Sequence, residues 1–443
     1  MKIQVRIMAS FILLTTLAIM ACGGSNGGNT TVTAGRFVAF HSEATNLVSD
    51  DTNGLRDIFV HDSQTGQTIR VNVASNGDQA LGGDSEYPSL SADGRYTAFQ
   101  SDATNLVSDD TNGLRDIFVH DSQTGQTIRV NVASNGDQAL GGGSGGVSIS
   151  ADGRYVAFRS GATNLVSGDT NGEQDIFVHD CQTGETIRVN VASNGDQANN
   201  GGNDRAYISA DGRYVAFQSD ATNLVSDDTN GLKDIFVHDN QTGQTTRVNL
   251  DSSGTQASGG GSEFPTISAD GRYTAFQSDA TNLVSDDTNG LRDIFVHDSQ
   301  TGQTIRVNVA SNGDQAAGGG SEKAVISGDG RYVGFHSDAT NLVTNDTNGL
   351  RDIFVNDSQT GQTIRVSVAS DGTQASGGIN EYPTISDDGR FVAWQSDATN
   401  LVTDDTNGDR DIYVHDTATG DTIRVSVSSA GDQADGWSYD PSY

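Results

Sequence analysis

The sequence is poor in cysteine and proline. Only 2 of its 443 residues are Cys and only 4 are Pro, whereas 54 are Gly. Two cysteines do not make a disulfide framework, so the fold must be stabilised by other means. No segment shows a sustained helical period, which excludes a mainly helical protein.

Positive charge is scarce as well. The 25 Lys and Arg residues are outnumbered by 58 Asp and Glu residues, which leaves a formal net charge of −33. A chain of this charge repels the phosphates of nucleic acids, which excludes them as partners. The apolar residues gather in short β-branched and aromatic runs, unlike those of a disordered chain. We therefore expect a folded protein.

The first residues have the features of a secretory signal. Lys2 and Arg6 precede an apolar stretch that is too short for a good membrane span. This stretch ends in Ile-Met-Ala before Cys22, which resembles the lipobox of bacterial lipoproteins. The resemblance implies a signal peptide over residues 1–21, a lipid on Cys22 and, because Gly23 follows, delivery to the outer membrane. The alternative is an ordinary cleaved secretory signal.

Residues 22–30 are rich in Gly and are expected to form a flexible tether. Such a tether reaches at most roughly 30 Å. The folded part, residues 31–443, would therefore lie close to a membrane surface. The remaining cysteine, Cys181, occupies a turn position and has no predicted disulfide partner or catalytic role.

Beyond the tether, the sequence is a repeat with a period of 59 residues. The triplet Asp-Gly-Arg recurs at this spacing, starting at Asp93, Asp152, Asp211, Asp270, Asp329 and Asp388. One period before Asp93, the variant Ala-Gly-Arg starts at Ala34. The chain therefore holds seven units, and units of this kind bury their apolar faces by stacking on their neighbours.

Each unit has the pattern of four short strands. In the second unit they are expected at residues 88–91, 95–101, 116–121 and 127–132, separated by turns and loops rich in Gly, Asn and Asp. Seven such units predict an all-β fold, a seven-bladed β-propeller of four-stranded repeats. A solenoid usually has a shorter period, and two sandwiches would not repeat at this spacing.

The ends of the chain raise the question of how the ring closes. The C-terminal Asp-Pro-Ser-Tyr, residues 440–443, resembles the start of an innermost strand that lacks its own partner. The first unit lacks a clear strand of this type, so the C-terminus would complete it. The alternative is that residues 31–33 fill that place.

Residues 208–243, ISADGRYVAFQSDATNLVSDDTNGLKDIFVHDNQTG, resemble the TolB-like, WD-repeat-like propeller repeats of bacterial envelope proteins. The resemblance extends from about residue 31 to the C-terminus. It implies a propeller at the cell envelope and is weak evidence for a particular function. Unlike TolB itself, the sequence shows no separate N-terminal α/β domain.

An acidic loop recurs in every unit with the pattern S-x-D-x-N-G-x-x-D, in which Thr replaces Ser twice. The spacing resembles calcium loops, in which oxygen ligands alternate and a Gly permits the turn. Two carboxylates per loop predict weak sites, with dissociation constants of about 10⁻⁴ to 10⁻³ M. The alternative is a structural turn, because Asn-Gly and Asp are turn residues. The candidate ligands are Asp51, Asn53, Asp57, Asp110, Asn112, Asp116, Asp169, Asn171, Asp175, Asp228, Asn230, Asp234, Asp287, Asn289, Asp293, Asp346, Asn348, Asp352, Asp405, Asn407 and Asp411.

A second set of acidic residues lies in the Gly-rich segment that leads from one unit to the next. We expect this segment on the same face as the acidic loops, near the central channel. There its acidic residues would give the channel mouth a negative potential and serve as binding residues. The alternative is solvated loop charge. The set comprises Glu86, Asp204, Glu263, Glu322, Glu381 and Asp440.

Signs of catalysis are few. Histidines occupy one strand-end position in six units, which indicates packing and not a single catalytic group. No Ser has a nucleophile-elbow context, and no H-E-x-x-H motif is present. We therefore predict a protein that is not an enzyme. These histidines are His61, His120, His179, His238, His297 and His415.

Together these features predict a lipid-anchored, monomeric β-propeller of the bacterial envelope. It would act as a binding or scaffold module for a protein or glycan, with calcium as a stabilising ion. The first alternative is an envelope polysaccharide hydrolase or lyase on the same scaffold. The second is a purely structural surface lipoprotein.

Overall fold

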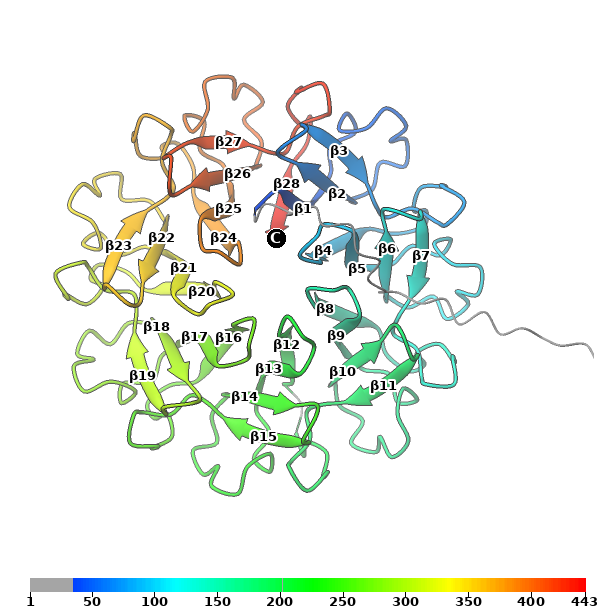
Figure 1. Cartoon of the computed structure of the whole chain (residues 1–443), viewed down its shortest axis with the longest axis horizontal. Coiled ribbons are helices and arrows are strands. Elements are labelled where there is room, and N and C mark those ends of the chain that lie inside the picture. The colour runs from blue at the N-terminus through cyan, green and yellow to red at the C-terminus, as the bar shows by residue number, and fades with distance from the viewer. Residues whose placement is uncertain (1–34, 201) are drawn as a thin grey trace, which may run out of the picture.

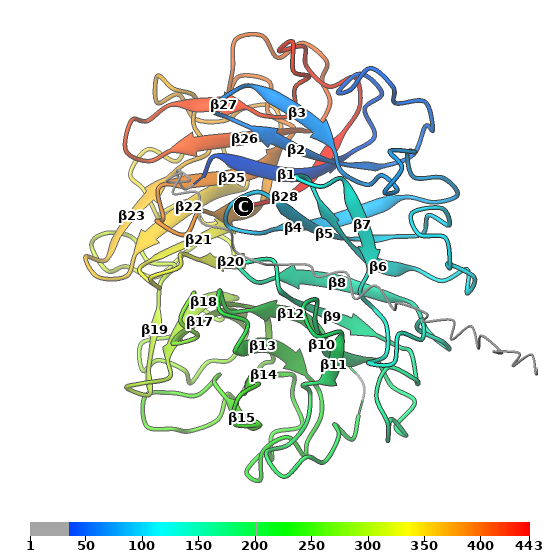
Figure 2. The ribbon, with the colours of Figure 1, turned by 45° about the vertical axis from the view of Figure 1, so that its right-hand side comes forward.

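The computed structural model describes residues 35–200 and 202–443, and they form a ring of seven four-stranded sheets around a central channel (Figure 1). Figure 2 shows the sheets as successive tilted blades. The described residues form no helix. The predicted seven-bladed β-propeller is confirmed.

The four strands of each blade follow one another from the channel to the outer edge of the disc, so the seven blades together form four concentric sets of strands. The innermost strands are β28 (Ser438–Ser442), β4 (Ser85–Leu90), β8 (Ser144–Ile149), β12 (Asp204–Ile208), β16 (Ser262–Ile267), β20 (Ser321–Ile326) and β24 (Asn380–Ile385). The second strands are β1 (Phe37–Ser42), β5 (Tyr96–Ser101), β9 (Tyr155–Ser160), β13 (Tyr214–Ser219), β17 (Tyr273–Ser278), β21 (Tyr332–Ser337) and β25 (Phe391–Ser396).

The outer half of each blade is built in the same way. The third strands are β2 (Asp57–Asp62), β6 (Asp116–Asp121), β10 (Asp175–Asp180), β14 (Asp234–Asp239), β18 (Asp293–Asp298), β22 (Asp352–Asp357) and β26 (Asp411–Asp416). The outermost are β3 (Gln67–Arg70), β7 (Gln126–Arg129), β11 (Glu185–Arg188), β15 (Gln244–Arg247), β19 (Gln303–Arg306), β23 (Gln362–Arg365) and β27 (Thr422–Arg424). Neighbouring strands are antiparallel throughout.

The antiparallel course puts the connections on two faces. The acidic loops and the Gly-rich segments lie together on one face, which we call the loop face. Asn53 Nδ2 of the first acidic loop, for example, donates to the carbonyl oxygen of Ala80, 3.1 Å away in the Gly-rich segment. The opposite face carries the short hairpin turns, and we call it the turn face. The expected placement of both acidic sets on one face is confirmed.

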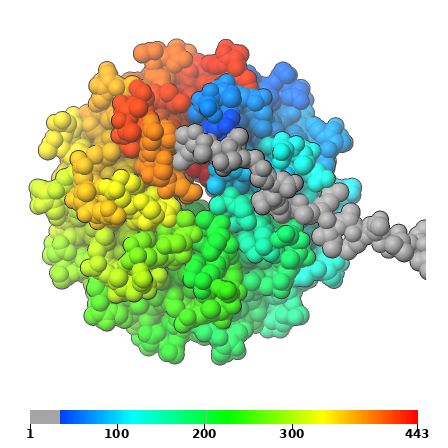
Figure 3. All heavy atoms as spheres, viewed as in Figure 1, coloured from blue at the N-terminus to red at the C-terminus, as the bar shows by residue number. Residues whose placement is uncertain are grey.

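The C-terminus closes the ring. Strand β28 pairs with β1, placing Ser438 opposite Ser42 and Ser442 opposite Ala39. The last strand of the chain therefore completes the first blade, and Figure 1 shows β28 beside β1 at the centre of the disc. In Figure 3, blue N-terminal and red C-terminal segments lie side by side in the closed ring. The alternative closure by residues 31–33 lies outside the described residues.

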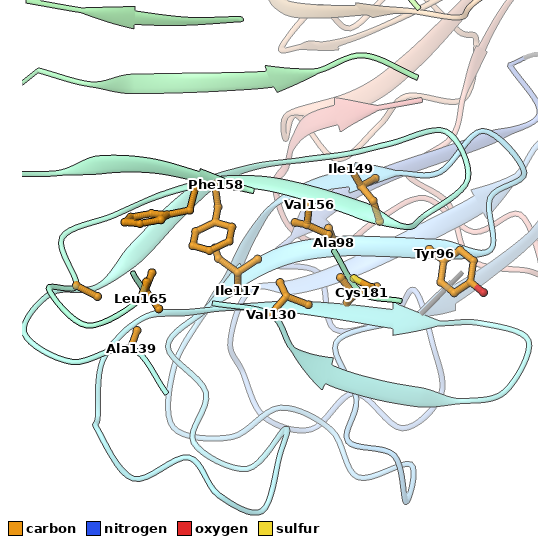
Figure 4. Packing of buried hydrophobic residues seen from close by; sticks show 13 residues of the cluster. Tyr96, Ala98, Ile117, Val130, Ala139, Ile149, Val156, Phe158, Leu165 and Cys181 are labelled. Carbon is orange, nitrogen blue, oxygen red and sulfur yellow. The ribbon is translucent and has the colours of Figure 1, made fainter. Parts of the chain in front are cut away.

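The core lies between blades. In Figure 4, Ala98, Ile117 and Val130 of one blade pack with Val156 and Phe158 of the next. Seven clusters of this kind follow one another around the ring. Because both faces of every blade are covered, the third strand is buried along nearly its whole length, and its central Ile-Phe-Val is a continuous apolar run.

Candidate binding site at the channel mouth

Every innermost strand carries a β-bulge next to the channel mouth. In β4 and β5, Glu86 lies opposite Gln100, but three residues later Ser89 lies opposite Ala98, two residues back. The strand begins at Ser85, three residues before the start predicted from the sequence. The bulge explains the difference, because the shift in register interrupts the regular strand pattern on which the prediction was based.

The residue after the acidic position of each bulge has a left-handed backbone. The seven positions, with φ between 47° and 62°, are Tyr87, Gly146, Arg205, Phe264, Lys323, Tyr382 and Asp440, which we call the mouth ring. This conformation costs a non-Gly residue about 1–2 kcal/mol. Strain of this kind, repeated where side chains meet in a cavity, points to a ligand-contacting segment.

Side chains of neighbouring blades hold the ring in place. The amide N–H of Phe264 donates to Gln218 Oε1 at 2.8 Å, and that of Lys323 donates to Gln277 Oε1 at 2.9 Å. Each Gln belongs to the second strand of the preceding blade. The strained backbone is therefore fixed by contacts between blades and not by local sequence.

The mouth ring lines a cavity of about 290 Å³ at the loop face. A second cavity of about 170 Å³ opens at the turn face. One apolar girdle bounds both cavities, and we call this level between them the waist of the channel. The girdle is formed by Leu90, Ile149, Ile208, Ile267, Ile326, Ile385 and Tyr443.

The mouth ring is where otherwise near-identical repeats diverge in chemistry. One structural position carries two tyrosines, a phenylalanine, two cations, an acid and a glycine. Recent duplication explains why the repeats are alike, and it does not explain why they differ here. Seven equivalent positions thus become one asymmetric site.

Cations and aromatic rings alternate across this site. Lys323 Nζ lies 3.2 Å from the centroid of the Phe264 ring and 4.9 Å from that of Tyr382, and Arg205 Cζ lies 4.7 Å from that of Phe264. These are cation–π distances. Burial, reinforced by the charge of Arg205, lowers the pKa of Lys323 to about 8.

The acid of the ring, Asp440, lies close to the two cations of the ring. Burial raises the pKa of Asp440 to about 6, against the opposing charges of Arg205 and Lys323. Its Oδ2 is 3.8 Å from Nδ1 of His41, whose pKa burial lowers to about 3, so this histidine is neutral. Asp440 and Lys323, both partly buried, therefore line one cavity, and shifted pKa values of this kind cluster at functional sites.

Asp440 corrects one sequence-based assignment. We expected it at the position of Glu86 and Glu381, but the structure places it one position further, in the mouth ring, and puts Tyr439 opposite His41 as Glu381 is opposite Gln395. The physical reason is that the last Gly-rich segment is one residue shorter than the others. Counting 59 residues from Glu381 therefore reaches Asp440, whereas the structurally equivalent residue is Tyr439.

The other predicted binding acids form a rim outside the mouth ring, and each pairs with a cation. Representative distances are 2.6 Å from Glu86 to Arg56, 3.1 Å from Glu263 to Lys233 and 2.8 Å from Glu381 to Arg351. Asp204 and Glu322 pair with Arg159 and Arg292 in the same way. Sequence reasoning did not identify these cationic partners. Their charges reduce the negative potential at the channel mouth that was expected from the acids alone.

The acidic loops bring their predicted residues together. In the fourth blade, Asn230 Oδ1 accepts from the backbone N–H of Leu232 at 2.9 Å, as in an Asx turn. Its Nδ2 donates to Asp234 Oδ1 at 3.2 Å. Burial raises the pKa of both Asp228 and Asp234.

The last residue of each outermost strand is an arginine that contacts the acidic loop, and sequence reasoning missed it. Arg247 Nη1 lies 3.5 Å from Asp228 Oδ1 and 3.4 Å from Asp234 Oδ2. Its recurrence at a constant distance after the last loop aspartate is a signal that was available in the sequence. The equivalent residues are Arg70, Arg129, Arg188, Arg306, Arg365 and Arg424.

In every loop, Oδ1 of the aspartate at the third position of the pattern accepts no hydrogen bond, and in the first loop neither oxygen of Asp51 does. The Asp51 side chain is about 2% exposed. In the described ranges, no group of three or more His, Cys, Asp or Glu residues has the arrangement of a metal site. Calcium binding therefore stays a prediction. The oxygens belong to Asp51, Asp110, Asp169, Asp228, Asp287, Asp346 and Asp405.

The repeated histidines have a structural role. His238 Nδ1, for example, lies 2.8 Å from Thr245 Oγ1 of the outermost strand, and burial lowers the pKa of this histidine to about 4. Cys181 is buried in an interblade cluster. The predicted lipidation site Cys22 and the tether lie outside the described residues. Where the chain is described, no helix is long and apolar enough to cross a membrane.

No protein-family model and no curated protein matches this chain, but solved structures do. TolB from Acinetobacter baumannii is 17% identical over 74% of this chain, with a TM-score of 0.40, and the chain spans 63% of that protein, less than two thirds. The β-propeller domain of the Trilobed protease from Pyrococcus furiosus is 11% identical over 89% of this chain and 95% of its own, with a TM-score of 0.51.

A puromycin-hydrolysing peptidase of Mycobacterium tuberculosis is 13% identical over 89% of this chain and 52% of its own, with a TM-score of 0.52. TolB is thus among the propellers that the chain matches, as the repeat predicts. At these identities the likeness is one of fold.

Proposed function

We propose that this propeller is a binding module of the bacterial cell envelope whose ligand, a glycan or a protein, enters the channel mouth on the loop face. One observation carries the proposal. One structural position of the described repeats, at which aromatic, cationic, acidic and glycine residues occur in turn, surrounds one cavity, and its backbone is strained. Such a cavity with convergent polar groups is the usual form of a ligand site.

The test is an array of bacterial envelope glycans and envelope-protein peptides, probed with the purified protein. We expect signals that disappear in a double variant of the mouth ring, Phe264→Ala with Tyr382→Ala. The matched control, Gln241→Ala with Gln300→Ala, changes two exposed side chains at the turn face and should keep every signal. Equal signals from the two double variants would refute the proposal, provided that both melt as the unaltered protein does.

A hydrolase or lyase acting on an envelope polysaccharide is the second candidate. It is favoured by the pKa values of Lys323 and Asp440, shifted towards neutrality in one cavity. Release of shorter fragments from a bound polysaccharide, lost in Lys323→Met, would support it. Binding without fragment release would favour the binding module.

The lipid anchor is part of the proposal and rests on the segment before Cys22. Cys22→Ser should release the protein from membrane fractions, because acyl chains supply the membrane affinity. Sedimentation of the variant with membranes after a salt wash would contradict the anchor. It would leave the site at the channel mouth unaffected.

Calcium as a stabilising ion is the last part. Its support is the buried oxygen of each loop that accepts no hydrogen bond, and the length of the arginine contacts, 3.4 Å or more at Asp228 and Asp234, which exceeds a close ion pair. An ion would draw the two aspartates together. Arg247 would then turn towards the exposed Asp227, already 3.4 Å away.

A further inference from the structure

The mouth contains a cation, Lys323, that has carboxylates in its surroundings but forms no close ion pair with any of them in the described residues. Lys233 at the rim lies 3.1 Å from Glu263. Within the described part of the chain, Lys323 has no carboxylate inside the 4.0 Å limit of an ion pair, and its ammonium rests on aromatic faces. Arg205 next to it has only a loose contact of 3.9 Å with Asp204. An anionic group on the ligand would give Lys323 and Arg205 the close ion-pair partner that each lacks.

The walls beside these cations are flat and apolar. Tyr87, Phe264 and Tyr382 come from three different blades and line the same cavity. Tyr87 is 39% exposed, so its ring is available at the entrance. Aromatic faces pack against the C–H faces of rings and chains, so the site suits a ligand that joins an apolar face to an anion.

An extended peptide is the less suitable occupant. It would be recognised by adding a strand to the free edge of an innermost strand. The bulge interrupts this edge in every blade, at the level of the cavity. Proline removes a further N–H donor from four of these edges, at Pro88, Pro265, Pro383 and Pro441. No blade therefore offers a continuous edge for peptide hydrogen bonds.

We propose that the channel mouth recognises a sugar that carries a carboxylate, a hexuronate residue, with Lys323 and Arg205 on the carboxylate and the aromatic side chains on the sugar ring. This inference rests on the proposed function and specifies its ligand class. The cavity of about 290 Å³ limits the recognised part to one or two sugar residues, free or at the end of a polymer.

The experiment is calorimetric titration of the full protein with cellobiouronic acid and with cellobiose, which differ by one carboxylate. We expect the acid to bind at least tenfold more tightly at pH 7. In Lys323→Met this preference should fall to about twofold, and Lys323→Arg should restore it. The matched control is Lys233→Met, which removes the ion-paired lysine at the rim and should retain the preference.

A pH series supplies a second readout. Lys323 is faced by Arg205, Glu322, Asp440 and Glu263, and its pKa is about 8. Loss of the ammonium above this pH should weaken binding of the acid by up to about tenfold between pH 7 and pH 9, and binding of cellobiose should not change. Lys323→Arg, which stays charged, should lose most of this pH dependence.

Two further probes separate the outcomes. One is a dipeptide, Ala-Tyr, with a free or an amidated C-terminus, and the other is a soluble polymer of glucuronic acid. Equal affinity for the two disaccharides, or tighter binding of the free dipeptide than of the sugar acid, overturns the inference. Mouth-dependent signals on the array would then still uphold the proposed function. Binding of the polymer but not the disaccharide, if lost in Lys323→Met, supports a polymer ligand.

Discussion

At the scale of the residue, glycine permits a close approach between neighbouring blades. In each Asp-Gly-Arg turn the Gly has a positive φ, and a methyl group there would meet an aromatic ring of the preceding blade. At Gly212, with φ of +75°, a Cβ atom would lie 2.1 Å from Cδ2 of Tyr155. The recurrence of this triplet therefore has a packing reason besides turn geometry.

We predict that Gly212→Ala lowers the free energy of unfolding by about 2–4 kcal/mol, from backbone strain and overpacking together. Gly243→Ala is the matched control, since Gly243 has φ of +72° with nothing within 4 Å of the added atom. It should cost only about 1 kcal/mol. Urea unfolding measures both, and equal losses would show that the contact with Tyr155 relaxes without cost.

At the scale of the element, the acidic loop is the segment whose role is still to be tested. Its Asx turn agrees with a structural role, and its buried aspartate oxygens without a hydrogen bond agree with an ion site. The two interpretations make different predictions. An ion site makes stability depend on calcium itself, whereas a structural turn makes it depend on ionic strength alone.

We predict that about 5 mM calcium raises the melting temperature above that in EDTA at equal ionic strength. Each occupied weak site should add about 1–2 kcal/mol by mass action. Asp228→Ala should lose part of this rise. Asp137→Ala, which removes an exposed aspartate outside the acidic loops, should keep it. An equal rise in sodium chloride would indicate charge screening and make the loops structural turns.

At the scale of the whole molecule, two features decide stability, and the first is closure of the ring. Strand β28 covers β1 and ends in Tyr443, which belongs to the girdle at the waist of the channel. Its removal would leave the first blade without an innermost strand and expose an unpaired edge.

Deletion of residues 438–443 should therefore lower the melting temperature by roughly 10 °C, which for a domain of about 400 residues corresponds to about 8–9 kcal/mol. Trp437→Ala, which changes an exposed side chain just before β28, should shift it by no more than a few degrees. Differential scanning calorimetry makes the comparison. A truncated protein that melts with the unaltered one would show that another segment completes the first blade.

The second feature is the balance of buried aspartates. Burial raises the pKa of Asp352 and of Asp411 to about 6, above the unfolded value of 3.8. The folded protein thus binds more protons than the unfolded chain between these values, so stability rises as the pH falls through this window. In contrast, the pKa of Asp62 is lowered to about 2 by Arg36, and its contribution is lost only below about pH 4.

We therefore predict a higher melting temperature at pH 5 than at pH 7.5, and a fall below pH 4 as the arginine-paired aspartates become protonated. Asp352→Asn removes one of the titrating groups and should reduce the rise between pH 7.5 and pH 5. A melting temperature that does not change across this range would contradict the raised pKa values of the loop aspartates.

The sequence by itself determined the number of blades and the order of strands within each blade. Period, alternation and turn chemistry are local properties, and they repeat with every Asp-Gly-Arg. The loop-face location of the two acidic sets followed from the same pattern, because antiparallel strands place alternate connections on the same face.

Only the tertiary structure decided which residues meet at the mouth. The bulge depends on contacts such as that between Gln218 and Phe264, which come from different blades. A one-residue deletion moved Asp440 from the rim into the ring, and pairing with β1 selected the C-terminus for closure. Each outcome depends on side chains or strands of different repeats meeting around the axis, and a pattern that describes one repeat at a time contains no information about such contacts.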